Sequence, residues 1–178
     1  MLRIYVDADS MTERQRSIIL RRVIGNPEAE CVFAADRSLP DVVRAIADDK
    51  AMRRKPFRDT LPPEEIRKIG SGIRMEVVEK GSNAADDYLV SIAEEGGVAV
   101  THDIPLSERL IAKGLIVIDD RGGRLTQENI RARMSERENN AIFREMGLFE
   151  SRQRRIDERT VREFAAAFDK AVSEAGRK

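Results

Sequence analysis

Ile4-Tyr5-Val6-Asp7-Ala8-Asp9 is a short apolar run that ends in aspartate. Three more runs of this kind follow, and stretches with a helical pattern separate them: Cys31–Asp36, Val98–Asp103 and Leu115–Asp120. Strands that alternate with helices predict a parallel sheet, in which all strands end along one edge. Ligands of such sheets bind at that edge. The sequence therefore predicts one sheet edge that is rich in carboxylates.

The composition is that of one folded domain without a strong charge bias. The chain has 178 residues, of which 41% are hydrophobic, enough for a core. Its 32 basic and 32 acidic residues balance, which argues against indiscriminate coating of nucleic acid but permits a local basic face. Cys31 is the only cysteine, so an internal disulfide is excluded, which fits a reducing compartment.

The sequence predicts a cytoplasmic protein that does not contact a membrane. Residues 1–9 already read as a strand with acids, unlike a secretory signal. No apolar run approaches the roughly 20 residues of a membrane span. The oligomeric state stays open, a homodimer included.

We predict a single domain over residues 1–178. Met1–Val6 is apolar on both faces and should be central in the sheet, whereas Ile73–Val78 should lie near an edge. The charge-rich segment 48–70 follows a helix that is predicted to end at Ala47, and it is interpreted as an insertion or lid. Residues 126–178 are predicted to form helices that pack on the core.

Asp7, Asp9 and Asp86 are candidate metal ligands. Side chains two apart in a strand point the same way, so Asp7 and Asp9 could hold one ion, although Asp9 could instead cap the next helix. Asp86 shares a helix face with apolar residues that should pack on the sheet. A carboxylate on a buried face needs a partner, and a metal ion would supply one. Compensation of the helix dipole is the alternative for Asp86.

Asp103 is the third principal candidate. It ends one strand, but Ile104-Pro105 follows it, so it could also cap a helix. Thr101 should share its side and could hydrogen-bond a substrate or an acid. His102 should point away from Asp103 and is not predicted to be a ligand.

Further acids follow other strands. Asp119 and Asp120 are candidate ligands, although Asp120-Arg121-Gly122-Gly123 could form an ordinary turn. Asp36 is a weaker candidate. Clustered carboxylates repel each other unless a cation or a shared proton compensates them. Oxygen ligands without cysteine or histidine favour Mg²⁺ or Mn²⁺, so we predict a divalent-metal site for chemistry on phosphate.

Substrate contacts are predicted from polar and basic residues. Asn83 precedes the helix of Asp86 as its predicted N-cap and joins Thr101 as a candidate contact. Arg53, Arg54 and Lys55 would hold phosphates if the segment 48–70 folds over the acidic edge. Otherwise this basic run is solvated surface.

Four motifs, in this order, resemble the YaiI/YqxD-type bacterial family: Ile4–Asp9, Gly81–Asp86, Val100–Leu106 and Asp120–Gly122. That family is largely uncharacterised and looks like a branch of the PIN-like nucleases. The resemblance implies a three-layer α/β/α sandwich with a mainly parallel sheet of about five strands, plus C-terminal helices. It also implies that Asp7, Asp86 and Asp103 are metal-binding catalytic acids that cut nucleic acid, RNA more than DNA.

This chain departs from the family pattern in the segment 48–70, which looks longer than usual, and at two places within the motifs. Ser10-Met11 follows Asp9 where the family continues with Ala-Cys-Pro, and Asn83 stands where an acid is frequent. The two departures within the motifs remove one ligand and one cysteine from the family pattern. They bear on activity more than on fold.

Two other functions fit parts of the sequence. Asp7-Ala8-Asp9, Thr101, Lys113 and Asp119-Asp120 follow the order of the haloacid-dehalogenase phosphatases, in which Asp7 would be the nucleophile. Met11 and the short chain between Thr101 and Asp119 count against that pattern. The other alternative is a non-catalytic PIN-like module that binds nucleic acid or another partner.

Overall fold

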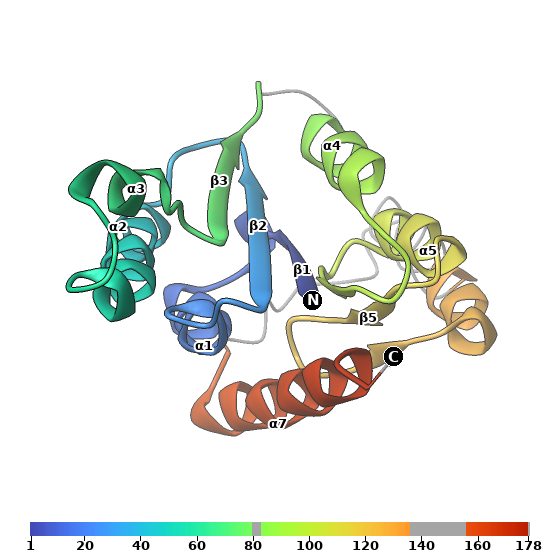
Figure 1. The fold of residues 1–178 in the computed structure, drawn as a ribbon. Helices are drawn as coiled ribbons and strands as arrows, with labels where there is room; N and C mark the ends of the chain where they lie inside the picture. The colour runs from blue at the N-terminus through green and yellow to red at the C-terminus, as the bar shows by residue number, and fades with distance from the viewer. Residues whose placement is uncertain (80–82, 136–155, 178) are drawn as a thin grey trace.

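The chain folds around one six-stranded sheet in the order β3-β2-β1-β4-β5-β6 (Figure 1). The computed structural model describes residues 1–79, 83–135 and 156–177. Five strands are parallel, and β6 pairs antiparallel with β5. The strands are β1 (Leu2–Asp7), β2 (Ala29–Ala35), β3 (Ile73–Val77), β4 (Val98–Val100), β5 (Ile116–Ile118) and β6 (Arg124–Leu125). The mainly parallel sheet is confirmed, and the two-residue β6 is the strand that the sequence pattern did not predict.

Helices cover both faces of the sheet, so the predicted three-layer α/β/α architecture is confirmed. One face carries α1 (Glu13–Val23), α2 (Pro40–Arg54) and α7 (Glu158–Ala175), and the other carries α4 (Ala84–Ile92) and α5 (Ile104–Ala112) (Figure 1). The short elements are η1 (Ala8–Ser10), η2 (Lys55–Phe57) and α3 (Pro63–Lys68). No helix in the described part of the chain is long and apolar enough to cross a membrane.

The predicted C-terminal helices pack on the core where the structure describes them. Residues 127–135 are helical, and Ile130 is buried with the residues of α4 and α5. Phe164 and Phe168 of α7 are fully buried on the other face of the sheet. The rest of the segment 126–178, namely residues 136–155 and 178, lies outside the described residues.

β1 lies in the middle of the sheet, as its apolar sequence predicts. Ile4, Tyr5 and Val6 are all buried, because α1, α2 and α7 cover one face and α4 and α5 the other. β1 pairs in parallel with β2 and with β4, so Asp7 at its end meets the ends of both neighbours. This arrangement brings the polar residues that follow the strands to one edge, which we call the carboxyl edge.

Helix α2 is longer than the sequence pattern predicted, because Asp49 and Arg53 in its charge-rich end bond to neighbouring loops instead of facing solvent. The helix continues past Ala47 to Arg54. Asp49 is fully buried, and its carboxylate accepts hydrogen bonds from the backbone N–H groups of Gly25 and Gly72 at 2.8 Å each. It also accepts a bond of 2.7 Å from the Ser71 hydroxyl and forms an ion pair of 2.9 Å with Arg53.

These contacts place residues 48–70 at the opposite edge of the sheet, which we call the amino edge. Arg53 donates to the carbonyl oxygens of Asn26 and Ala29, next to the start of β2. Gly72 has to be glycine, because a Cβ there would meet the Arg53 guanidinium and the Ala29 carbonyl. The predicted lid therefore does not lie over the acidic edge. The segment joins α2 to β3 at the far end of the sheet.

Replacement of Asp49 should be the most damaging single change at the amino edge. Burial alone would raise the pKa of Asp49, but the bonds from Ser71, Gly25, Gly72 and Arg53 together lower it. A lowered carboxyl pKa stabilises the fold above the ordinary pKa, and that stability is lost as the pH falls. Asp49→Asn should therefore cost about 3 kcal/mol at pH 7, because the Arg53 guanidinium, which is largely removed from solvent, loses its anion. Urea unfolding at pH 7 and at lower pH measures this cost.

The deficit of Asp49→Asn relative to wild type should shrink as the pH falls below the ordinary pKa of aspartate. Asp48→Asn is the matched control, because Asp48 is the exposed neighbour on the same helix and should cost little. Equal unfolding midpoints for the two variants would show that the Asp49 contacts do not stabilise the fold.

Candidate functional site

Acidic side chains line a pocket of about 340 Å³ at the carboxyl edge. Five of its eight lining residues are acidic: Asp7, Asp9, Asp36, Glu79 and Asp86. Val78, Asn83 and Ala85 complete it. The structure therefore brings together five of the candidate residues, namely Asp7, Asp9, Asp36, Asn83 and Asp86. We call this cavity the acidic pocket.

Thr101 holds Asp7 in place from the end of β4. Its hydroxyl donates to Asp7 Oδ2 at 2.7 Å and accepts a bond from the Asp103 N–H at 3.0 Å. Thr101 is almost fully buried, so this orientation is fixed by packing as well. Burial raises the pKa of Asp7, and the bond from Thr101 is the largest influence that lowers it. The predicted contact between Thr101 and an acid is present, with Asp7 as the acid.

Asp86 enters the pocket from the first turn of α4. Its pKa is raised by burial and then by the negative charges of Asp103 and Asp7, while Arg109 partly offsets them. The three principal candidates are therefore close enough for their charges to interact. Such mutual repulsion is what a site for a cation shows before the cation binds.

Asp103 serves as a helix cap in addition to lying near Asp86. Its Oδ1 accepts a bond of 2.9 Å from the Leu106 N–H and so caps α5, as Ile104-Pro105 suggested. Asp103 does not line the acidic pocket. Its charge nevertheless acts on Asp86, so it remains a candidate at the border of the site.

Asp9, Asp36 and Arg37 form a charged group on the other side of Asp7. Asp9 Oδ2 accepts a bond of 2.7 Å from the Asp36 N–H, and Asp9 Oδ1 lies 3.3 Å from the Arg37 guanidinium. The alternative of Asp9 as a helix cap is not what the structure has, because Thr12 caps α1 with Gln15 in a reciprocal capping box. Asp9 instead ties the end of β1 to the loop after β2.

The sequence interpretation missed Glu79, which lines the pocket, and Arg37, which pairs with the pocket residue Asp9. Glu79 follows β3 at the carboxyl edge, so the rule that selected aspartates at strand ends would have found it if glutamate had been included. Arg37 stands directly after Asp36 at the end of β2. Its pairing with Asp9 depends on the β1–β2 register and is invisible in the sequence.

The Asp119 carboxylate accepts hydrogen bonds within a turn, and Asp119 does not line the acidic pocket. Its Oδ1 accepts bonds from the N–H groups of Arg121 and Gly123, and its Oδ2 lies 3.3 Å from Arg133. A Cβ on Gly123 would clash with this carboxylate, so the turn requires glycine there. The alternative of an ordinary turn is therefore the one that the structure has for Asp119.

His102 lies near both Asp120 and Asp7. Burial raises the pKa of Asp120, and the charge of His102 lowers the pKa of both Asp120 and Asp7. The carbonyl of Asp120 accepts a bond from the buried Gln15 side chain, which fixes this loop against α1. Asp120 does not line the acidic pocket, so it stays a candidate at its border.

The basic run 53–55 lies away from the pocket. Arg53 is committed to Asp49 at the amino edge, and Arg54 donates to the carbonyl oxygens of Ile69 and Arg67. Lys55 begins η2 beside them. The prediction that these residues bind phosphate over the acidic edge is not supported by their positions. Arg37 and Arg109 are the basic side chains that neighbour the acids instead.

Asn83 has the one positive φ angle of a non-glycine residue in the described chain, at 73°. It is the N-cap residue of α4, as predicted, but its side chain makes no capping bond. Asparagine tolerates this left-handed conformation better than most residues. Its side chain therefore lines the pocket beside Asp86 without a structural task at the helix end.

The donor chemistry of the pocket suits a hard divalent cation, although a preformed metal centre is not present. Carboxylate oxygens are the ligands that Mg²⁺ and Mn²⁺ prefer, and those of Asp7 and Asp86 repel each other. Among residues 1–79, 83–135 and 156–177, no three histidine, cysteine or acidic side chains are grouped as metal ligands. Thr101 and the α5 cap engage oxygens of Asp7 and Asp103. Asp7 and Asp86 are thus the pair best placed to begin binding.

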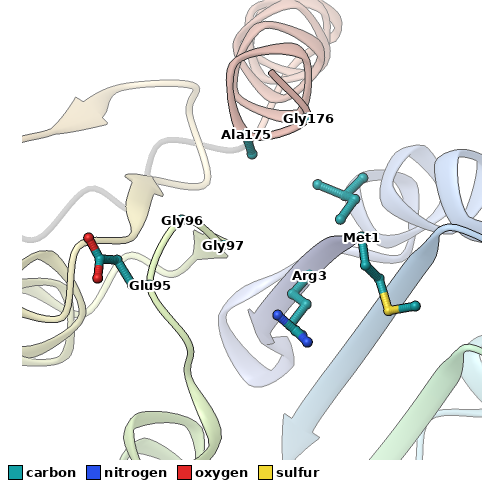
Figure 2. Close-up of a pocket in the computed structure, with 8 residues that line it drawn as sticks. Met1, Arg3, Glu95, Gly96, Gly97, Ala175 and Gly176 are labelled. Carbon is teal, nitrogen blue, oxygen red and sulfur yellow. The ribbon is translucent and has the colours of Figure 1, made fainter. Parts of the chain in front are cut away.

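A second cavity, of about 360 Å³, lies at the amino edge. Figure 2 shows Arg3 and Glu95 as its ionisable side chains, on separate elements. Arg3 already pairs with Glu94 at 2.9 Å. This cavity holds no cluster of acids or nucleophiles, so the acidic pocket is the candidate functional site.

Comparison with known proteins gives relatives of the same kind. The family model described as an uncharacterised bacterial family, YaiI/YqxD, matches residues 63–174. A UPF0178 protein of Pseudomonas aeruginosa is 30% identical over 97% of this chain and 91% of its own length. A UPF0178 protein of Pseudomonas entomophila is 28% identical over 97% of this chain and 97% of its own length. One of Stutzerimonas stutzeri is 35% identical over 64% of this chain and 75% of its own length. No solved structure matches the chain significantly.

Asp86→Asn should separate a metal ligand from a helix cap. The raised pKa of Asp86 means that its charge destabilises the fold at neutral pH, so the metal-free variant should be as stable as wild type or slightly more stable. Mn²⁺ at a hundred times its dissociation constant should raise the melting temperature of wild type by about 5 to 11 °C. The variant should lose most of that shift in a thermal melt.

Asp87→Asn is the matched control, because Asp87 is the exposed neighbour and pairs with Arg109 at 2.8 Å. It should keep the metal-induced shift. If Asp86→Asn destabilises the metal-free protein and keeps the shift, Asp86 is a structural residue of the first turn of α4.

Proposed function

This chain belongs to the YaiI/YqxD family, and we propose that it is a metal-dependent nuclease of PIN-like type that hydrolyses RNA at the acidic pocket. One observation carries the proposal: Asp7 and Asp86 come from different elements and line one pocket at the carboxyl edge, where the charge of Asp7 adds to the burial that raises the pKa of Asp86. Isolated helix caps or turn residues would not converge in this way. The PIN-like assignment rests on the motif resemblance and agrees with the mainly parallel sheet.

Asp7 and Asp86 would hold one Mg²⁺ or Mn²⁺ ion, with Asp103, Asp9 or Asp120 as further neighbours. A bound divalent ion activates a water molecule and neutralises charge at the phosphorus. The protein's own part is to fix the carboxylates and the substrate. Thr101 fixes the rotamer of Asp7 through its 2.7 Å bond. A carboxylate held in this way does not have to be reorganised when the cation arrives.

Arg37 and Arg109 would bind phosphate groups on either side of the reacting one. Arg37 is 61% exposed and contacts Asp9, and Arg109 is 43% exposed and contacts Asp87. Both lie next to acids of the site, and a guanidinium matches phosphate oxygens well. Asn83 would add a polar contact from the pocket wall. Two flanking cations and an acidic centre suit a polyanionic chain better than a small phosphate monoester.

The position of Lys113 disfavours the phosphatase alternative. In that pattern the lysine has to stand beside the nucleophile Asp7. Lys113 instead donates to the carbonyl oxygens of Val90 and Ala93 at the end of α4, at the amino edge. The lysine is therefore at the amino edge of the sheet, whereas Asp7 is at the carboxyl edge, so it cannot assist a phosphatase reaction there.

Purified protein should cut labelled single-stranded RNA in Mn²⁺ or Mg²⁺, and a chelator should stop the reaction. Asp7→Asn should lower the rate by about a hundredfold or more, because a charge aimed at the reacting centre is lost. Lys113→Met should leave the rate unchanged, since Lys113 lies at the far edge. The measurement is product formation on a denaturing gel.

Other outcomes of the same experiment would favour the other functions. Covalent attachment of beryllium fluoride to Asp7, together with a loss of activity in Lys113→Met, would support the phosphatase. Tight RNA binding without cleavage in either metal would support a non-catalytic binding module.

Thr101→Val should reduce RNA cleavage through Asp7 rather than through stability. The valine fills similar space but removes the hydroxyl that lowers the pKa of Asp7, so that pKa should rise further. We expect the rate to fall about 10- to 100-fold, and the acidic limb of the pH–rate profile to move to higher pH. Thr101→Ser should restore both, because it keeps the hydroxyl. A lower rate with an unmoved pH profile would mean that Thr101 does not act through Asp7.

A further inference from the structure

In the part of the chain that the structure describes, the outer edge of β3 pairs with no other strand. β3 ends the sheet order, and Figure 1 shows it at the near edge, with α2 and α3 to one side and α4 to the other. Toward β2, the Gly72 carbonyl accepts from Cys31 and the Val78 N–H donates to Ala35. The backbone N–H and C=O groups of the even-numbered residues therefore point toward β2. Those of Ile73, Met75 and Val77 point away from the sheet. Such an edge is a template for another strand.

The side chains along this edge are incompletely satisfied. Arg74 is exposed, and the described residues offer it no ion-pair partner. Glu76, two residues later on the same face, hydrogen-bonds to the Tyr88 side chain of α4, and the charge of Arg74 acts on the same tyrosine. Val77 is 51% exposed, which is high for an apolar strand residue. The edge thus carries an exposed positive charge, a partly exposed negative charge and an exposed apolar side chain.

We propose that β3 is a self-association edge, through which two copies of this chain pair antiparallel about a two-fold axis at Met75. In this register Met75 faces Met75 of the second copy, and Ile73 faces Val77. Arg74 then faces Glu76 of the other copy, and the two-fold axis repeats that pair. The outward backbone groups of the odd-numbered residues form the hydrogen-bonded pairs.

Arg74 and Glu76 select this register over its neighbours. They occupy the non-hydrogen-bonded positions, at which opposing side chains are closest. The outward N–H and C=O groups of one strand have to pair with those of the other strand. The two strands can therefore slide past each other only in steps of two residues. One step in either direction sets Arg74 against Arg74, or Glu76 against Glu76, which is repulsive. The sequence is therefore complementary to itself in one alignment, as a two-fold interface requires.

Sedimentation equilibrium tests the proposal with charge reversal. The wild type should approach twice 20.1 kDa with rising concentration. The scan should cover roughly 10 to 500 µM, because one strand pair buries a small interface. Arg74→Glu and Glu76→Arg should each weaken association about tenfold or more, because like charges then oppose each other twice. The double variant Arg74→Glu/Glu76→Arg should dimerise like wild type, because the charge pairs are restored in reverse.

Two further variants make the test specific to β3. Arg67→Glu is the matched control, with the same charge change on α3, and it should dimerise normally. Val77→Pro removes an outward N–H without touching the β2 ladder, and it should give a folded monomer. A wild type that stays monomeric throughout, a dimer that Arg74→Glu does not weaken, or a double variant as monomeric as the single ones would overturn the proposal.

Discussion

The parallel pairing of β1 with β2 and with β4 is the constraint on which the acidic pocket depends. Asp7 pairs in register with Ala34, and Val6 pairs with Val100. Thr101 therefore follows β4 beside Asp7, and its hydroxyl reaches the carboxylate. Because side chains alternate between faces, a slip of one residue in either pairing would turn this set of side chains to opposite faces. The buried residues of β1 prevent such a slip, so the hydrophobic core also determines the chemistry of the edge.

The two edges of the sheet treat aspartate in opposite ways. At the amino edge, Asp49 is buried with two backbone donors, a hydroxyl and a guanidinium, and its pKa is lowered. At the carboxyl edge, Asp7 and Asp86 have fewer donors and acidic neighbours, and the pKa of each is raised. A carboxylate with every lone pair engaged supports the fold. One that is buried near like charges is ready for an added cation or proton.

The sequence was sufficient for the five parallel strands and for the convergence of Asp7 and Asp86, because these follow from the hydrophobic pattern and from the geometry of a parallel sheet, but not for the antiparallel β6. It could not give the buried Asp49, whose donors at Gly25 and Gly72 are distant in the chain. The charged residues around Asp49 were therefore interpreted as part of a solvent-exposed segment. For the same reason, Arg53 looked available for phosphate although it is committed to Asp49.

Lys113 shows why the order of residues along a chain does not establish a catalytic site. The order Asp7, Thr101, Lys113, Asp119 fits a phosphatase, yet a helix in a parallel α/β fold returns the chain from one edge to the other. Asp103 begins α5 at the carboxyl edge, and Lys113 follows its end at the amino edge. The nine residues of that helix carry Lys113 away from Asp7 and Thr101, although the phosphatase pattern needs the lysine beside them. A functional pattern in this fold therefore has to be tested by the edge at which each residue stands, and the nuclease proposal draws its acids from a single edge.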